Sequence, residues 1–219
     1  MDYLLRGRGA VVESMLFRQF PHVDRFLDFS STFQLLVAVV LSARCTDAQV
    51  NRVTPALFAA APNAHVMADF PLAKLENLIH GVGFFRQKAK ALSALSQILV
   101  TRWNGVVPLT FEDLEFLPGV GHKTAAVVLG VCTNQPTFPV DTHVYRLSRR
   151  WRLSDGRTPI AVERDLKQIF TPVKWFPLHQ RMIAYGRNDC TARKCDGTRC
   201  AICRAMAAMS LGQSIRQQK

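Results

Sequence analysis

The chain has 219 residues and a mass of 24.6 kDa, and its 28 basic and 16 acidic side chains leave a net charge of +12. Because 48% of the residues are hydrophobic and 20% are charged, the composition is globular and argues against a disordered basic tail as the source of the charge, which predicts a polyanionic partner. The strongest apolar stretch, Leu35 to Leu41, is far shorter than the roughly 20 residues of a membrane span, which excludes a membrane-spanning protein. The N-terminal segment lacks the basic start and apolar core of a signal peptide, so we expect a cytoplasmic location, close to the nucleoid if the source is bacterial.

Apolar residues recur at spacings of three and four along most of the chain, which predicts an all-α fold. The segment 33–41 is apolar on nearly every side and is expected to form a core helix. Pro62, Gly81 and Gly105 mark breaks between helices, and Thr110 and Asp141 are candidate N-caps. In chain order, the expected helices cover residues 33–41, 47–60, 73–80, 87–103, 111–117, 123–132, 142–152, 161–170 and 178–185.

A tight apolar hairpin, Leu117-Pro-Gly-Val-Gly121, leads directly into the helix expected from residue 123. Gly119 and Gly121 permit positive φ angles and a close approach, while Leu117 and Val120 can be buried against the two helices. The N–H groups in the first turn of a helix have no partner within it, and a phosphate oxygen can accept from them. On a basic chain this pattern predicts phosphate binding, with an ordinary helix–turn–helix corner as the alternative.

Lys123 lies in the first turn of that helix, where the helix dipole disfavours the charged amine and favours a nucleophile. A simple phosphate contact is the alternative role. Asp141 follows 18 residues later, at the start of another helix, and by itself it predicts only an N-cap. A candidate nucleophile and a carboxylate at two helix starts of a basic protein together indicate chemistry on DNA.

Five segments resemble endonuclease III in order and spacing. The hairpin segment 117–129 and the segment 140–146 resemble its helix-hairpin-helix and catalytic region. Upstream, the segments 41–47 and 83–89 are similar to the entrance of its helical domain and to a DNA-probing loop. Downstream, the segment 185–190 resembles the start of its iron–sulfur region. The resemblance spans about residues 30 to 205.

This resemblance implies the helix-hairpin-helix DNA glycosylase fold, with two helical domains and the active cleft between them. One domain, of six helices, is expected over residues 26–135. The other, the iron–sulfur cluster domain, combines residues 1–25 with 136–219. Lys123 is expected on one wall of the cleft and Asp141 on the other.

The resemblance also implies a bifunctional DNA glycosylase and AP lyase of base excision repair, which removes oxidised pyrimidines and cleaves the abasic site. Lys123 is then the nucleophile that forms a Schiff base, and Asp141 activates it and stabilises positive charge on the sugar. Glu115 matches an acidic position of the family and either assists proton transfer or acts as a cap. The partner is double-stranded DNA with damaged bases or abasic sites, and we expect a monomer.

Three positions depart from the family pattern. His122 replaces an arginine, which makes one phosphate-directed charge dependent on pH. Arg44 replaces a glutamine and Phe84 a leucine, where the family fills the gap left by an extruded base. For Arg44 a surface phosphate contact, and for Phe84 a buried core position, are the alternatives. These changes alter the expected range of lesions and the preference for the opposite base.

Four cysteines near the C-terminus, Cys190, Cys195, Cys200 and Cys203, predict a metal centre in a basic tail that has few large apolar residues. Six, two and five residues separate the cysteines of the family, whereas four, four and two separate them here. If Cys200 and Cys203 are the close pair, Met209 occupies the position of the last ligand and Cys195 supplies the missing thiolate. We expect a 4Fe-4S cluster, with structural zinc as its rival. Cys45 and Cys132 lie in apolar segments and are expected in the core.

Three other functions remain open at this point. An enzyme that is mainly an AP lyase would retain Lys123, whereas a monofunctional glycosylase of altered specificity would lack a nucleophilic lysine. A non-enzymatic DNA-binding module would keep the hairpin without needing Asp141.

Overall fold

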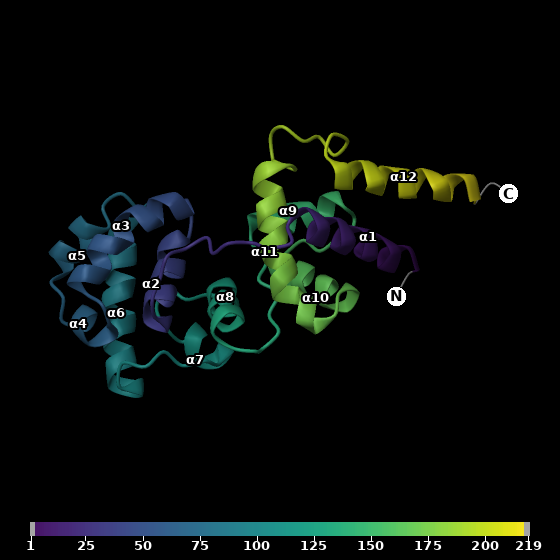
Figure 1. Cartoon of the computed structure of the whole chain (residues 1–219). Coiled ribbons are helices and arrows are strands. Elements are labelled where there is room, and N and C mark those ends of the chain that lie inside the picture. Colours follow the sequence, from purple (N-terminus) through teal and green to yellow (C-terminus); the bar gives the residue numbers. More distant parts are fainter. Residues whose placement is uncertain (1–2, 217–219) are drawn as a thin grey trace. The chain divides into compact units, whose positions relative to one another are not determined.

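The structure is a computed structural model that describes the backbone of residues 3–216 and the side chains of residues 4–210. Over this range it contains helices and no strand, which confirms the all-α prediction (Figure 1). The helices are α1 (Tyr3–Gln19), α2 (Thr32–Ser42), α3 (Asp47–Ala60), α4 (Ala64–Ala68), α5 (Leu72–Leu78), α6 (Phe85–Trp103), α7 (Phe111–Glu115), α8 (His122–Cys132), α9 (Thr142–Arg150), α10 (Pro159–Ile169), α11 (Pro172–Asn188) and α12 (Ala201–Arg216).

The chain divides into two compact units, each with its own apolar core. Residues Arg25–Gln135 form the unit that contains α2 to α8, which we call the hairpin unit. Met1–Asp24 and Pro136–Lys219 form the other, which we call the cysteine unit; its described helices are α1 and α9 to α12.

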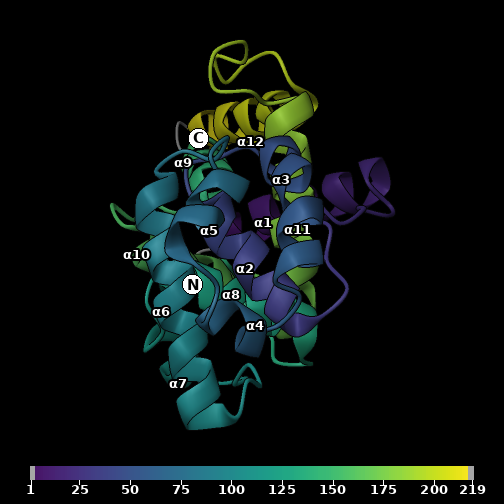
Figure 2. The same cartoon turned by 90° about the vertical axis from the view of Figure 1, so that its left-hand side faces the viewer.

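Helix α2 is the centre of the hairpin unit and packs against α3, α6 and α8 (Figure 2). Its side chains from Leu35 to Leu41 are all buried, because the helix is apolar on every side, as the sequence predicts. The side chain of Ser31 caps it by accepting from the N–H of Gln34. One short helix, α4, is not predicted by the sequence. It follows the break at Pro62, and the side chain of its N-cap, Asn63, accepts from the N–H of Val66.

Two helices of the cysteine unit, α1 and α12, are also absent from the prediction. Gly7 and Gly9 lower the intrinsic helix propensity of α1, but they permit close packing. A Cβ atom on Gly9 would lie 2.4 Å from Ile169 Cγ2 of α10, and α1 also packs against α11 and α12. Tertiary packing therefore compensates for the weak local propensity.

Helix α11 is longer than predicted, because it begins at Pro172 and continues through Pro177. Proline is well tolerated in the first turn, and the hydrogen bond lost at Pro177 is offset by burial of Leu178 and Met182. No helix among the described residues is both long enough and apolar enough to cross a membrane.

Candidate functional site

The hairpin between α7 and α8 has a buried apolar side. The side chains of Leu117 and Val120 are buried, and the N–H of Val120 donates to the carbonyl of Leu117 at 3.1 Å. Gly119 has a φ of +80°, and a Cβ atom there would lie 3.0 Å from the Cβ of Ala91. Glycine is therefore required at this position for both backbone conformation and space.

Gly121 differs from the sequence-based prediction of a positive φ. Its φ is −102°, in the extended region, and it serves as the N-cap of α8. A Cβ atom at Gly121 would meet nothing within 4 Å, so the protein leaves open space beside this backbone. This space suits the close approach of a ligand to the start of α8.

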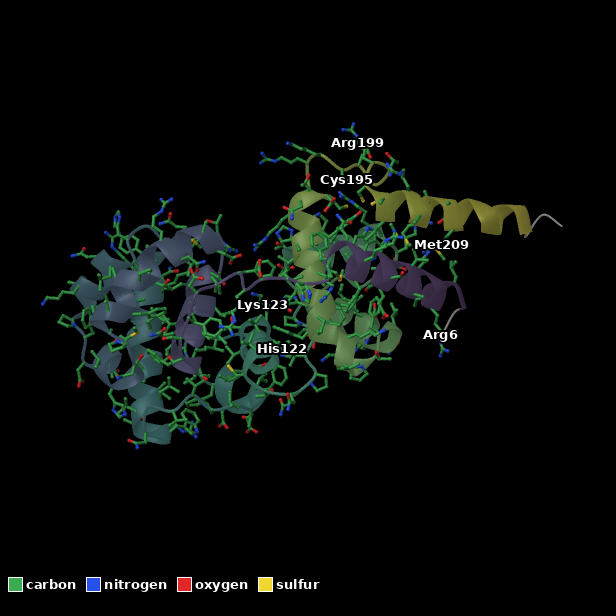
Figure 3. All side chains as sticks on the ribbon, in the orientation of Figure 1. Arg6, His122, Lys123, Cys195, Arg199 and Met209 are labelled. Atoms are coloured by element: carbon green, nitrogen blue, oxygen red, sulfur yellow. The ribbon has the colours of Figure 1, made fainter. Side chains whose placement is uncertain are left out.

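Lys123 is the second residue of α8, directly after His122 (Figure 3). Its side chain is half-buried, and Gly121 has no side chain with which to cap the first turn of the helix. The lysine side chain thus begins at the N-terminal end of α8, which is the positive end of the helix dipole, as the sequence predicts.

The side chains of Glu115 and His122 are hydrogen-bonded across the base of the hairpin. The Oε1 atom of Glu115, at the end of α7, lies 2.7 Å from Nδ1 of His122. The ring of Phe111 stacks on the imidazole with centroids 5.0 Å apart. Glu115 does not cap α7, because Thr110 does so by accepting from the N–H of Asp113.

Asp141 is the N-cap of α9 in the cysteine unit, as predicted. Its Oδ1 atom accepts a hydrogen bond of 2.8 Å from the N–H of Val144. His143 follows in the first turn of α9, and burial lowers the pKa of its imidazole despite the neighbouring carboxylate of Asp141. The carboxylate of Asp141 is half-buried and is oriented by the backbone it caps.

Arg44 and Phe84 lie side by side at one end of α2 and α6. Both adopt left-handed backbone conformations, with φ of 53° and 59°, which are uncommon for residues other than glycine. The Arg44 guanidinium carbon lies 5.7 Å from the centroid of the Phe84 ring. Phe84 is 56% exposed, so the alternative of a core aromatic is wrong. Both side chains border a pocket of about 340 Å³, whose other lining residues are Val40, Ala43, Gln87, Lys88, Ala91 and Gly119.

The four C-terminal cysteines come together in the cysteine unit. Their Sγ atoms lie within 4.8 Å of one another, and all four residues are buried. Cys195 belongs to the loop between α11 and α12 (Figure 3). Its sulfur nevertheless lies beside the other three. Met209, in α12, instead packs against the core of the cysteine unit. A Cβ atom on Gly7 of α1 would lie 3.4 Å from the methyl carbon of Met209.

Two residues that the sequence analysis did not identify surround these sulfurs. Arg150, at the end of α9, donates from Nη1 to Cys190 Sγ at 3.2 Å and to the carbonyl of Thr191 at 3.2 Å. The Tyr185 hydroxyl accepts a hydrogen bond of 3.1 Å from the N–H of Ile202, which lies between Cys200 and Cys203, and burial raises the pKa of Tyr185, so the hydroxyl stays protonated. A basic helix and a lone tyrosine gave no sequence signal for these contacts, because their partners are distant in the chain.

The other two cysteines, Cys45 and Cys132, are half-buried and pack against the core of the hairpin unit. The expected core location therefore holds only in part.

Residues 37–172 match the model of the HhH-GPD superfamily of base excision DNA repair proteins. Endonuclease III of Synechocystis sp. (strain PCC 6803) is 41% identical over 193 residues, which cover 86% of this chain and 87% of that protein. Endonuclease III of Bacillus subtilis is 39% identical over 195 residues, which cover 89% of this chain and 88% of that protein. The chain belongs to the endonuclease III family.

Solved structures of endonuclease III agree with this membership. A trapped covalent intermediate of endonuclease III with DNA matches with a TM-score of 0.86 and 37% identity over 90% of this chain and 93% of that one. A non-covalent endonuclease III–DNA complex matches over the whole of both chains with a TM-score of 0.87 and 35% identity. Endonuclease III enzymes are DNA glycosylases and AP lyases of base excision repair, and this chain is one of them.

The buried cysteines of this endonuclease III homologue fit the 4Fe-4S cluster of the family. Four thiolates provide one protein ligand for each of the four irons. The N–H donor of Arg150 suits a negatively charged sulfur. Cys195 places a fourth sulfur beside the other three despite the altered spacing, so the residues present fit such a group.

Proposed function

We propose that this enzyme removes oxidised pyrimidines from double-stranded DNA and cleaves the resulting abasic site, with Lys123 as its nucleophile. The observation that carries this assignment is the position of Lys123, in the first turn of the helix that follows the hairpin. The hairpin presents Gly119 and Gly121 for phosphate contacts, with Leu117 and Val120 as its buried support. The damaged nucleotide must leave the stack to reach such an amine.

In this mechanism the neutral amine of Lys123 attacks C1′ of the extruded nucleotide. The bond from nitrogen to C1′ forms, the bond from C1′ to the base breaks, and the base leaves with a proton. The bond from C1′ to O4′ then breaks as O4′ takes up a proton, and the open sugar is a protonated Schiff base that draws electrons from C2′. Loss of a proton from C2′ then expels the 3′ phosphate by β-elimination.

We assign to Asp141 the stabilisation of positive charge on the sugar and assistance in deprotonating the lysine. Its carboxylate is oriented by the hydrogen bond to the Val144 N–H, so little reorganisation is needed during the reaction. Glu115 is assigned a supporting part in proton transfer. The carboxylate of Glu115 contacts Nδ1 of His122, the residue directly before Lys123. His122 itself is assigned to the phosphate contact of the hairpin.

Arg44 and Phe84 are assigned to the gap that the extruded base leaves in the duplex. An exposed aromatic ring can stack on a neighbouring base, and a guanidinium can donate to base edges or phosphates. Their exposure at the rim of one pocket supports this role.

We further propose that the cysteine unit is the iron–sulfur domain and that Cys190, Cys195, Cys200 and Cys203 hold its cluster. When bound, the cluster cross-links four thiolates in a segment with few large apolar residues. The flanking side chains of Arg193, Lys194 and Arg199 are exposed and suit phosphate contacts. A monomer close to the nucleoid remains our expectation.

Borohydride trapping tests the assignment of Lys123. Wild-type enzyme, Lys123→Ala and Lys123→Arg are incubated with duplexes that carry thymine glycol or an abasic site. We expect a trapped adduct with wild-type enzyme on both duplexes and with neither variant, because arginine keeps the charge but is not a nucleophile. Trapping on the abasic duplex alone would favour the AP lyase alternative. Intact binding with no adduct on either duplex would favour a monofunctional glycosylase or a DNA-binding module.

A further inference from the structure

Lys88 is a buried lysine in α6 that the proposed mechanism does not use. Only 8% of its surface is exposed. Its Nζ atom donates to the carbonyl of Leu41 at 2.9 Å and to the carbonyl of Ala43 at 2.6 Å. These carbonyls belong to the C-terminal end of α2, where the helix itself supplies no donors and where a cation is favoured by the helix dipole. Burial lowers the pKa of this amine, because removing a charged group from water costs free energy. The hydrogen bonds to the two carbonyls offset this cost.

The backbone of Lys88 is hydrogen-bonded to the backbone of Phe84. The backbone N–H of Lys88 donates to the carbonyl of Phe84 at 3.0 Å. The side chain of Lys88, in turn, donates to the carbonyl of Ala43, the residue directly before Arg44. Lys88 therefore connects the backbone that carries Phe84 to the backbone that carries Arg44.

These two backbones are close together and strained. A Cβ atom on Gly83 would lie 3.5 Å from the carbonyl oxygen of Arg44. Arg44 and Phe84 both have positive φ, a conformation that persists only where surrounding contacts impose it. The side chains meet in a cation–π contact of 5.7 Å above the pocket that Lys88 helps to line. Because both side chains are exposed, their contact alone does not hold them in place.

We propose that Lys88 is a positioning residue that holds Arg44 and Phe84 as one rigid wedge, and that this rigidity is needed to open the base stack. The inference rests on the proposed function, because a wedge is useful only to an enzyme that extrudes a base. Stack opening requires a preformed aromatic surface, since a mobile ring would lose conformational entropy on insertion. Cleavage of an abasic site in single-stranded DNA, where no stack must be opened, does not require the wedge.

The experiment compares Lys88→Met with Lys88→Arg and Lys90→Met. Methionine keeps the length of the side chain without a donor, whereas arginine can still donate to two carbonyls. Lys90 is the matched control, because it is exposed and lies two residues along α6, on the face opposite Lys88. Each protein is assayed under single-turnover conditions on a duplex with thymine glycol and on a single strand with an abasic site, and its melting temperature is measured.

We expect Lys88→Met to slow base removal from the duplex by about ten- to a hundredfold, the loss produced by a misplacement of about 1 Å. Cleavage of the single-stranded abasic site should change by less than about twofold, Lys88→Arg should recover most of the duplex activity, and Lys90→Met should match the wild type. Equal losses on both substrates, or no loss on either, would overturn the proposal. If Lys88→Met fails to fold, Lys88→Gln replaces it and is judged by the same criteria.

A second measurement separates the inference from the proposed function. A 2-aminopurine base beside the lesion becomes fluorescent when the stack opens, and this signal needs no chemistry. We expect wild-type enzyme to raise the fluorescence and Lys88→Met to lose most of that rise. In a Phe84→Ala background, Lys88→Met should have little further effect, because the two residues act through one wedge. If wild-type enzyme cleaves neither substrate, the proposed function fails, and an equal fluorescence rise with Lys88→Met overturns the inference independently.

Discussion

The Nδ1 atom of His122 lies 2.7 Å from Oε1 of Glu115, and this contact joins the first residue of α8 to the last residue of α7. The hairpin between them is thus held at its base by a side-chain pair as well as by its buried leucine and valine. The ring of Phe111 stacks on the imidazole of His122 and so packs against this pair. Two of the predicted site residues, Glu115 and His122, therefore act on each other.

His122→Arg should make DNA binding more sensitive to salt. Arginine keeps a donor for Glu115 and carries its charge at every pH of the assay, so a phosphate contact at this position releases a counterion on binding. We expect the slope of log K against log salt to become more negative by up to about one. Fluorescence anisotropy at several salt concentrations measures it, and an unchanged slope would exclude a phosphate contact at this position.

Glu115→Gln should slow β-elimination at an abasic site by about a hundredfold, because the variant has no carboxylate to accept a proton. Glutamine can still bond to His122, so the hairpin should keep its stability. Single-turnover cleavage and thermal unfolding measure the two effects. If Glu115→Gln cleaves as fast as the wild type, the only role left for Glu115 is to orient His122.

Two substitutions at Asp141 separate its structural and chemical roles. Asparagine is as good an N-cap as aspartate, so Asp141→Asn should keep the stability while losing the charge. Asp141→Ala should cost about 1 kcal/mol of folding free energy as well. Both variants should remove the base roughly a hundred- to a thousandfold more slowly, as expected for the loss of one electrostatic group. Normal catalysis by Asp141→Asn would reduce Asp141 to a helix cap.

The two glycines of the hairpin should respond differently to alanine. Gly119→Ala forces a side chain into a φ of +80° and against Ala91, so it should destabilise the protein by about 1–2 kcal/mol. Gly121→Ala enters open space at an ordinary φ, so its cost should be only that of alanine as a poorer N-cap than glycine, below about 1 kcal/mol. It should nevertheless weaken DNA binding, because the added methyl group occupies the approach to the start of α8. Unfolding and binding curves for both variants test the contrast, and unchanged binding by Gly121→Ala would contradict it.

Cys195→Ser should remove the cluster, because it deletes one of four convergent thiols. The iron content of anaerobically purified protein should fall from about four atoms per chain, and the visible absorbance of the cluster should disappear. Cys132→Ser is the matched control, since Cys132 belongs to the hairpin unit and should leave the iron unchanged. Met209→Leu should also retain iron. Wild-type protein with zinc and no iron would contradict the cluster itself.

Local patterns predicted most of the helices. The apolar segment of α2, the N-caps Thr110 and Asp141 and the hairpin all depend on residues close together in the chain, and the structure confirms them. The prediction failed where tertiary packing outweighed a local signal against helix formation. Glycines that weaken α1 allow its close packing on α10, and Pro177 lies inside a helix whose apolar face is buried.

The amino-acid sequence was enough to establish the order of the motifs, the hairpin that leads into Lys123, and the presence of four cysteines in a basic tail. These features are local, so neighbouring residues specify them. The contacts of Arg150 with Cys190 and of Lys88 with Ala43 became visible only in the folded protein, which also brings the Cys195 sulfur to the other three, as predicted. Such contacts join residues from different elements, and their partners are selected by burial and by the need to satisfy each buried polar group.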